Sequence, residues 1–306
     1  MRCKYSCQHR YNIHPQKSTL IKTERTKTNH QHHTISLGES PKQQEQQTTH
    51  LGIIRAAKYE TKLNIQEHIS VARRTLYTLI AVGLNGQEGL NPRTAYKIYQ
   101  AYVIPRLLYG LEILPLNSTQ MTELKQFHLK TLRCFQSLPI RTATAAVYML
   151  LGALPIEAEM HKRQLSLLYS ILASENTKLE NLIERQMTVN AGNSDSFFSR
   201  IQEILKYYNL PTVSEFKDQL PSKMQKKKDI NRTIANKWST ILQEEMKEKS
   251  TLKRCNTQML KIHETHPVWK TLPPLTYEVK KANIKARPLT GTYLLQEHFQ
   301  RFTGNT

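Results

Sequence analysis

The helical period of apolar side chains constrains the fold of this chain more than any other feature. From Tyr59 to Val82 the apolar residues recur at helical spacing, with Gly83 as a stop signal after them: Leu63, Ile65, Ile69, Ala72, Leu76, Leu79 and Ile80. Residues with this spacing form one apolar stripe on an α-helix, and polar residues occupy the opposite face. The pattern therefore predicts a long amphipathic helix over 59–82.

Start and stop signals along the remaining chain predict further helices. Pro92 lies in the first turn of one helix, Pro105 is expected to kink it, and Ser118 or Thr119 caps the next. Additional helices are predicted over 118–138, 142–151, 155–174, 178–187, 196–208, 213–220, 222–249 and 289–299. The chain has only 10 glycines in 306 residues, which suits helices because glycine is a weak helix former. We therefore expect a mainly α-helical fold.

Strand signals are confined to the N-terminal region. In RYNIHPQKSTLI, residues 10–21, apolar and aromatic residues flank the turn signal at Pro15, and HLGII at 50–54 also has strand character. Between them, residues 22–49 are polar, rich in Gln and Thr and without period, which predicts a loop or insert, with a short strand at 34–37 as an alternative. The helical fold should thus include a small β patch near the N-terminus.

The charge balance favours a polyanionic partner. The chain has 44 Lys and Arg residues against 24 Asp and Glu, a formal net charge of +20. Such an excess binds phosphate backbones by releasing condensed counterions, although a membrane surface, or no polyanion, are alternatives. No apolar run approaches 18 residues and MRCKYSCQHR lacks the apolar core of a signal peptide, so we expect no membrane span. Four scattered cysteines predict an intracellular location, nuclear or cytoplasmic.

One block of the sequence resembles a known family. Residues 102–168, YVIPRLLYGLEILPLNSTQMTELKQFHLKTLRCFQSLPIRTATAAVYMLLGALPIEAEMHKRQLSLL, are similar to the region after the catalytic palm in reverse transcriptases of non-LTR, LINE-type retrotransposons. ARRTLYTLIAVGLNGQEGL at 72–90, HRYNIHPQKSTLI at 9–21 and THLGI at 49–53 resemble the same family in the same order. The resemblance is strongest over 50–172 and weak after 176.

This resemblance implies a division into three segments. Residues 1–55 would be a residual palm segment that includes the polar loop 22–49. Residues 56–175 would form a thumb-like helical domain, and residues 176–306 a basic, more polar helical region.

The resemblance also implies roles for individual residues. Lys17 would lie near the phosphates of an incoming nucleotide, as in polymerase motif D, and Leu51 and Gly52 would support the primer end. The partner would be an RNA or DNA primer–template duplex, which the thumb grips through basic side chains. The candidates for this grip are Lys58, Lys62, Arg73 and Arg74.

The catalytic carboxylates of that family have no counterpart in this sequence. Polymerases clamp the attacking and leaving oxygens with two metal ions held by carboxylates, and reverse transcriptases place an Asp pair there. The three aspartates of this chain, Asp195, Asp218 and Asp229, are isolated from one another. The family's metal motifs would precede residue 1. We therefore expect no metal site, no cofactor and no polymerase activity in this chain, although full-length members use Mg²⁺.

A basic run in the C-terminal region has two interpretations. KMQKKKDINR, residues 223–232, contains Lys226, Lys227 and Lys228, which either contact nucleic acid or form a solvated helix face.

Two functions remain open for the whole chain. It is either a truncated reverse transcriptase-like protein that binds primer–template nucleic acid, or a helical interaction protein whose charge is incidental. The sequence indicates no particular oligomeric state.

Overall fold

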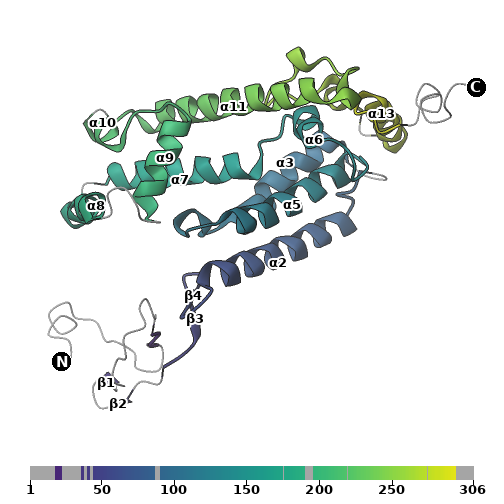
Figure 1. The fold of residues 1–306 in the computed structure, drawn as a ribbon. Coiled ribbons are helices and arrows are strands. Elements are labelled where there is room, and N and C mark those ends of the chain that lie inside the picture. Colours follow the sequence, from purple (N-terminus) through teal and green to yellow (C-terminus); the bar gives the residue numbers. More distant parts are fainter. Residues whose placement is uncertain are drawn as a thin grey trace, which may run out of the picture. The chain divides into compact units, whose positions relative to one another are not determined.

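Helices make up most of the described chain (Figure 1). The computed structural model describes residues 18–22, 36–37, 40–41, 44–86, 90–174, 176–189, 196–218, 220–273 and 275–293. The prediction of a mainly α-helical fold with a small β patch is confirmed. The chain divides into two compact units, Met1–Glu67 and His68–Thr306. The predicted boundary at 175/176 lies inside the second unit.

The first unit contains two small antiparallel sheets and the start of α2 (Glu60–Ala81). β1 (Ser36–Leu37) pairs with β2 (Ser40–Pro41), and β3 (Gln47–His50) pairs with β4 (Ile53–Ala56). Leu20 also forms an isolated bridge with Gln44. The predicted strands over 10–21 fall mostly outside the described residues, and 18–22 form only this bridge.

The prediction of one strand over residues 50–54 is wrong. His50 ends β3 and Ile53 begins β4, so Leu51 and Gly52 form the turn between two strands. The reason is the backbone conformation, because φ is +50° at Leu51 and +77° at Gly52. Positive φ at both central residues of a two-residue loop matches the twist of a β-hairpin, as in type I′ turns.

The second unit is built from helices whose ends follow local capping signals. Asn91 caps the helix that Pro92 begins, and this helix ends before Pro105, so the predicted kink is a break between two helices. The cap of α5 is Asn117 rather than the predicted Ser118 or Thr119, because Asn117 and Gln120 form a reciprocal capping box. The helices of this unit after α2 are α3 (Pro92–Tyr102), α4 (Ile104–Leu108), α5 (Ser118–Phe135), α6 (Thr144–Leu151), α7 (Ile156–Leu172), α8 (Thr177–Val189), α9 (Phe197–Tyr207), α10 (Val213–Asp218), α11 (Lys223–Glu248), α12 (Pro267–Lys270) and α13 (Thr276–Leu289).

The predicted helix over 289–299 is wrong at its start. Leu289 is the last residue of α13, and the chain then turns at Gly291, where φ is +63°. The buried stripe of α13 is small or polar, with Val279, Ala282 and Asn283 among its members. Such a stripe has little hydrophobic signal between lysines, which is why the pattern did not predict this helix. Residues 294–299 lie outside the described residues.

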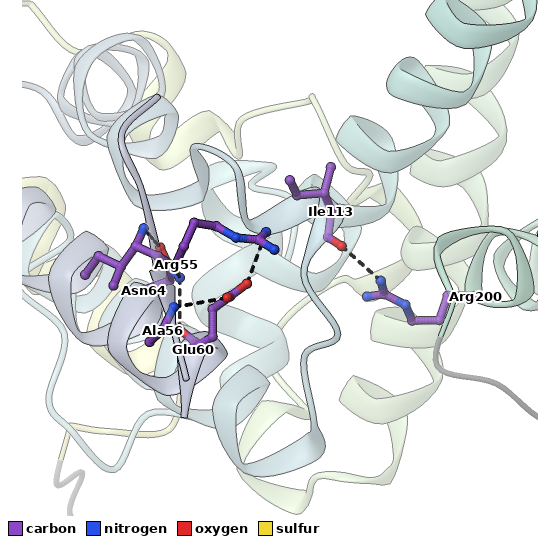
Figure 2. Close-up of polar contacts among 7 residues, drawn as sticks. Arg55, Ala56, Glu60, Asn64, Ile113 and Arg200 are labelled. Carbon is purple, nitrogen blue, oxygen red and sulfur yellow. Dashed lines mark hydrogen bonds and ion pairs between the residues drawn. The ribbon is translucent and has the colours of Figure 1, made fainter. Parts of the chain in front are cut away.

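The core of the second unit surrounds α6. All of its residues from Ala145 to Leu151 are buried, and α6 packs against α3, α5, α11 and α12. A helix that is apolar on every side is expected in the centre of a fold. Figure 1 shows α11 running alongside α7, in agreement with their contacts. α9 is held by Arg200, which donates to the carbonyl oxygen of Leu114. It also donates to the carbonyl oxygen of Ile113 at 3.3 Å, the contact drawn in Figure 2.

A buried polar network lies inside this core. His128 Nε2 lies 3.1 Å from the Leu154 carbonyl oxygen, so it donates there, and Nδ1 accepts from the Tyr99 hydroxyl at 2.9 Å. The imidazole stacks against Tyr99 and Tyr148. Because His128 is fully buried, desolvation lowers its pKa to about 4. The network thus holds a neutral histidine between α3, α5 and α6.

Among the described helices, none is long and apolar enough to cross a membrane.

Candidate nucleic-acid interface

The β3–β4 hairpin brings the two predicted primer-support residues to its tip. Leu51 is 76% exposed and adopts a positive φ, a conformation that costs a leucine about 1 kcal/mol or more. Gly52 adopts the same region without that cost because it lacks a Cβ. An apolar side chain held in a strained, exposed turn is a feature that collects at binding sites. Among the described residues of the first unit, the tip is therefore one exposed apolar feature that can contact a ligand.

The hairpin is locked to the first turns of α2 by side chains of that helix (Figure 2). Asn64 is 1% exposed; its Oδ1 accepts from the Ile54 N–H at 2.8 Å and its Nδ2 donates to the Ile54 carbonyl at 2.7 Å. Glu60 accepts from the Ala56 N–H at 3.2 Å and forms an ion pair with Arg55 at 3.3 Å. These contacts satisfy the outer edge of β4, which would otherwise be unpaired. The direction of the tip relative to these first turns is thereby fixed.

The predicted gripping residues are exposed in both units. Lys58 and Lys62 are exposed in the first unit, just before and at the beginning of α2. Arg73 and Arg74 are exposed in the second unit, on the later turns of the same helix. Exposed cations can contact the phosphate oxygens of a nucleic acid. Lys17 lies outside the described residues.

The part of α2 that carries the arginine pair is anchored to α4. Arg106 donates from Nη1 to the Thr75 hydroxyl at 2.6 Å, and His68 Nδ1 donates to the Arg106 carbonyl at 3.1 Å. Thr75 follows the pair directly on the helix. The backbone of Arg73 and Arg74 is therefore held in place while their side chains are exposed to solvent.

The basic run of α11 is split rather than uniformly solvated. Lys227 and Lys228 are exposed, whereas Lys226 is only 7% exposed, with its ammonium 4.0 Å from the centre of the Tyr169 ring on α7. Burial, with a smaller effect of Lys223, lowers the pKa of Lys226 to about 8. The interpretation of this run as a solvated face is thus wrong for Lys226, although it fits Lys227 and Lys228.

A pocket beside Lys226 collects basic residues that the sequence did not single out. It has a volume of about 380 Å³ and lies between α7 and α11, with Lys162, Arg163 and Tyr169 from α7 among its lining residues. We name it the α7–α11 pocket. One signal was present in the sequence: Lys226, Ile230 and Ile234 recur every four residues and share one face of α11, and both isoleucines are buried. A lysine in line with a buried stripe is turned towards the neighbouring helix.

The carboxylates in the described ranges form no candidate metal site. Asp229 forms an ion pair with Arg232 at 3.0 Å and accepts from Gln225 at 3.0 Å. Within the same ranges there is no group of three or more His, Cys, Asp or Glu side chains that could hold a metal ion. Asp195 lies outside the described residues.

Comparisons with known proteins add no relative. No model of a known protein family, no curated protein and no solved structure matches this chain.

Proposed function

We propose that this chain is a reverse transcriptase-like protein of a LINE-type retrotransposon that binds primer–template nucleic acid without catalysing polymerisation. The sequence resemblance described above, in its order along the chain, supports the proposal. The observation that carries it is the β3–β4 hairpin, where Leu51 and Gly52 occupy an exposed two-residue turn. Residues 57–59 separate β4 from the long helix α2. The resemblance assigns primer support to Leu51 and Gly52.

The proposed contact at the hairpin is apolar. Leu51 would pack against the sugar or base of the terminal primer nucleotide, and Gly52 would let the backbone approach it closely. Lys58 and Lys62 would contact phosphates near this end. Lys17, by the same resemblance, would lie near the leaving pyrophosphate in a full-length polymerase. In the family that the sequence resembles, aspartates hold the Mg²⁺ ions, and these aspartates have no counterpart in this sequence.

The proposed contact in the second unit is electrostatic. Arg73 and Arg74 would neutralise phosphates of the duplex, and each contact releases bound counterions. Such contacts read no bases, so affinity should depend strongly on salt and weakly on sequence. The net charge of +20 supplies the long-range attraction.

A salt titration of duplex binding tests this proposal. The binding constant of the full chain for a fluorescent primer–template is measured by anisotropy between 50 and 300 mM KCl. Each duplex phosphate contact contributes about 0.9 to the slope of log K against log salt. Arg73→Ala combined with Arg74→Ala should therefore flatten the slope by about 1 to 2 units on unrelated sequences alike.

The control is a pair of exposed lysines that carries the same total charge as the two arginines. Lys280→Ala combined with Lys285→Ala removes two charges from α13, where both side chains are exposed. The slope should change little in this variant. Equal slopes in the arginine variant and the wild type would contradict the assignment of the grip to α2. Absence of binding at 50 mM KCl would favour a helical interaction protein instead.

A further inference from the structure

The α7–α11 pocket concentrates positive charge in a concave space. Its basic lining residues come from both helices: Lys162 and Arg163 from α7, and Lys223, Lys226 and Lys227 from α11. The one carboxylate in the lining is Glu159, which is itself buried. Five cations and one carboxylate give the pocket a positive electrostatic potential, which attracts an anion. The low-dielectric walls of a concave site concentrate the electric field of these charges.

Lys226 is the buried cation of this site. It is 7% exposed, and among the described residues it has neither a carboxylate within ion-pair distance nor a hydrogen-bond acceptor. Its neighbour is the face of Tyr169, 4.0 Å from the ammonium to the ring centre. A cation–π contact offsets only part of the cost of removing an ammonium from water. An anion bound in the pocket would offset the remainder.

Lys226 also lines a second hollow, whose carboxylates are Glu215, Asp218 and Asp229. Two of these three carboxylates have partners of their own. Glu215 accepts from the Thr212 N–H at 2.8 Å, and Asp229 is paired with Arg232. None of the three forms an ion pair with Lys226. The ammonium is therefore available to a ligand in the α7–α11 pocket.

The remaining walls of the pocket suit a ring as well as a phosphate. Ile104, Ile230 and the Tyr169 ring supply apolar surface, while Gln100 and Asn231 supply amide groups that can read a polar edge. The pocket lies beside the first turns of α11, whose positive helix end adds to the attraction for a phosphate. A volume of about 380 Å³ is in the range of small-ligand sites.

We propose that the α7–α11 pocket binds the phosphomonoester of a nucleotide, with Lys162, Arg163 and Lys226 holding the phosphate and the apolar wall receiving the base or sugar. This phosphomonoester can belong to a free nucleotide or to the 5′-phosphorylated end of a strand. A duplex backbone in mid-strand has no terminal phosphate to insert, so this site is distinct from the grip proposed on α2. It goes beyond the proposed function and does not depend on it.

Calorimetric titration of the full chain tests the site. The probes are deoxyadenosine, dAMP, inorganic phosphate, and a six-nucleotide DNA strand with either a 5′-phosphate or a 5′-hydroxyl. We expect dAMP or the 5′-phosphorylated strand to bind at least about tenfold more tightly than its unphosphorylated counterpart. Binding of dAMP identifies a free nucleotide as the source, and binding of the phosphorylated strand alone identifies a strand end. If inorganic phosphate binds as tightly as dAMP and as the phosphorylated strand, the assignment of the site to nucleotides is overturned.

Two matched lysine variants complete the test. Lys226→Met keeps the length of the side chain and removes its charge, and it should weaken nucleotide binding at least about tenfold. Lys247→Met makes the same change at an exposed lysine in the last turn of α11, outside the pocket lining, and should leave that affinity unchanged. Lys226→Met removes a buried charge, so it should fold, which its circular dichroism spectrum checks. Equal affinity in both variants and the wild type would overturn the proposal, whatever the salt slope on duplex DNA.

Discussion

Replacing Asn64 by leucine is expected to release the β3–β4 hairpin from α2. Thr49 and Ile54 face each other in the hairpin, and the Ile54 N–H and C=O point outward to Asn64. Leucine has a similar volume but cannot accept or donate these bonds. The variant therefore leaves a backbone donor and a backbone acceptor at the edge of β4 without their partner.

The size of the effect follows from the bonds that are lost. Asn64 makes two hydrogen bonds to Ile54 and a third to the Glu60 carbonyl at 2.9 Å. The third bond lies within α2, so only the two bonds to Ile54 hold the hairpin, and at about 1 kcal/mol for each bond the hairpin loses about 2 kcal/mol. A two-stranded hairpin is marginal on its own, so this loss is comparable to its whole local stability. Amide protection across 47–56 should fall about 30-fold.

Hydrogen exchange followed by mass spectrometry measures this change segment by segment. The control is Gln66→Leu, two residues along the same helix, where the side chain is exposed and the hairpin should retain its protection. Peptides from α5 should exchange at the wild-type rate in both variants, because α5 belongs to the other unit. Unchanged protection of 47–56 in Asn64→Leu would refute the view that this amide holds the hairpin.

Two further predictions concern the core of the second unit. Burial lowers the pKa of His128 to about 4, so as the pH falls the imidazole is protonated in the unfolded chain before it is protonated in the folded chain. The free energy of unfolding therefore decreases as the pH falls from about 6.5 to 4. From pH 7 to pH 5 the wild type should lose about 2 kcal/mol more in urea unfolding than His128→Phe, and equal losses would contradict this linkage. Gly152→Ala places a Cβ 2.5 Å from the Glu264 carbonyl oxygen at a φ of +65°, and should lower the free energy of unfolding by about 2–4 kcal/mol. Gly83→Ala, where φ is +104° and no atom lies within 4 Å, should cost about 1 kcal/mol, and equal costs would exclude the contact as the cause.

The helices could be predicted from the sequence because their signals are local. α11 was expected over 222–249 and spans Lys223–Glu248, since Ser222 caps its first turn and a regular apolar stripe follows. α7 was expected over 155–174 and spans Ile156–Leu172, after a proline at its N-cap. Caps and periods act within a few residues, so reading them needs no knowledge of the tertiary structure.

The hairpin could not be predicted at the same level because its strands carry little pattern. β3 is QTTH, which is polar and mostly exposed, and it is a strand only because β4 pairs with it. Leu51 gave no turn signal, since leucine rarely adopts a positive φ. Here the pairing of two segments, supported from outside by Asn64, decides the conformation of the backbone.

The pocket was beyond sequence reasoning for a different reason. Lys162 and Arg163 lie some sixty residues before Lys226, and only the packing of α7 against α11 brings them to one hollow. The charge run itself was visible, but its division into buried and exposed lysines depends on the rotation of α11 about its axis. That rotation is set by the isoleucines on the same face.

The most direct test of the proposed function compares two DNA ends. The wild-type chain is titrated, at one salt concentration, with a primer–template that has a recessed 3′ end and with a blunt duplex of the same primer sequence. If Leu51 supports a primer end, burying part of its exposed side chain contributes about 1 kcal/mol, so the recessed duplex should bind about fivefold more tightly. Leu51→Ser should remove that preference and leave the blunt duplex unaffected. Equal affinity of the wild type for the two duplexes would contradict primer-end binding and leave only a basic helical protein.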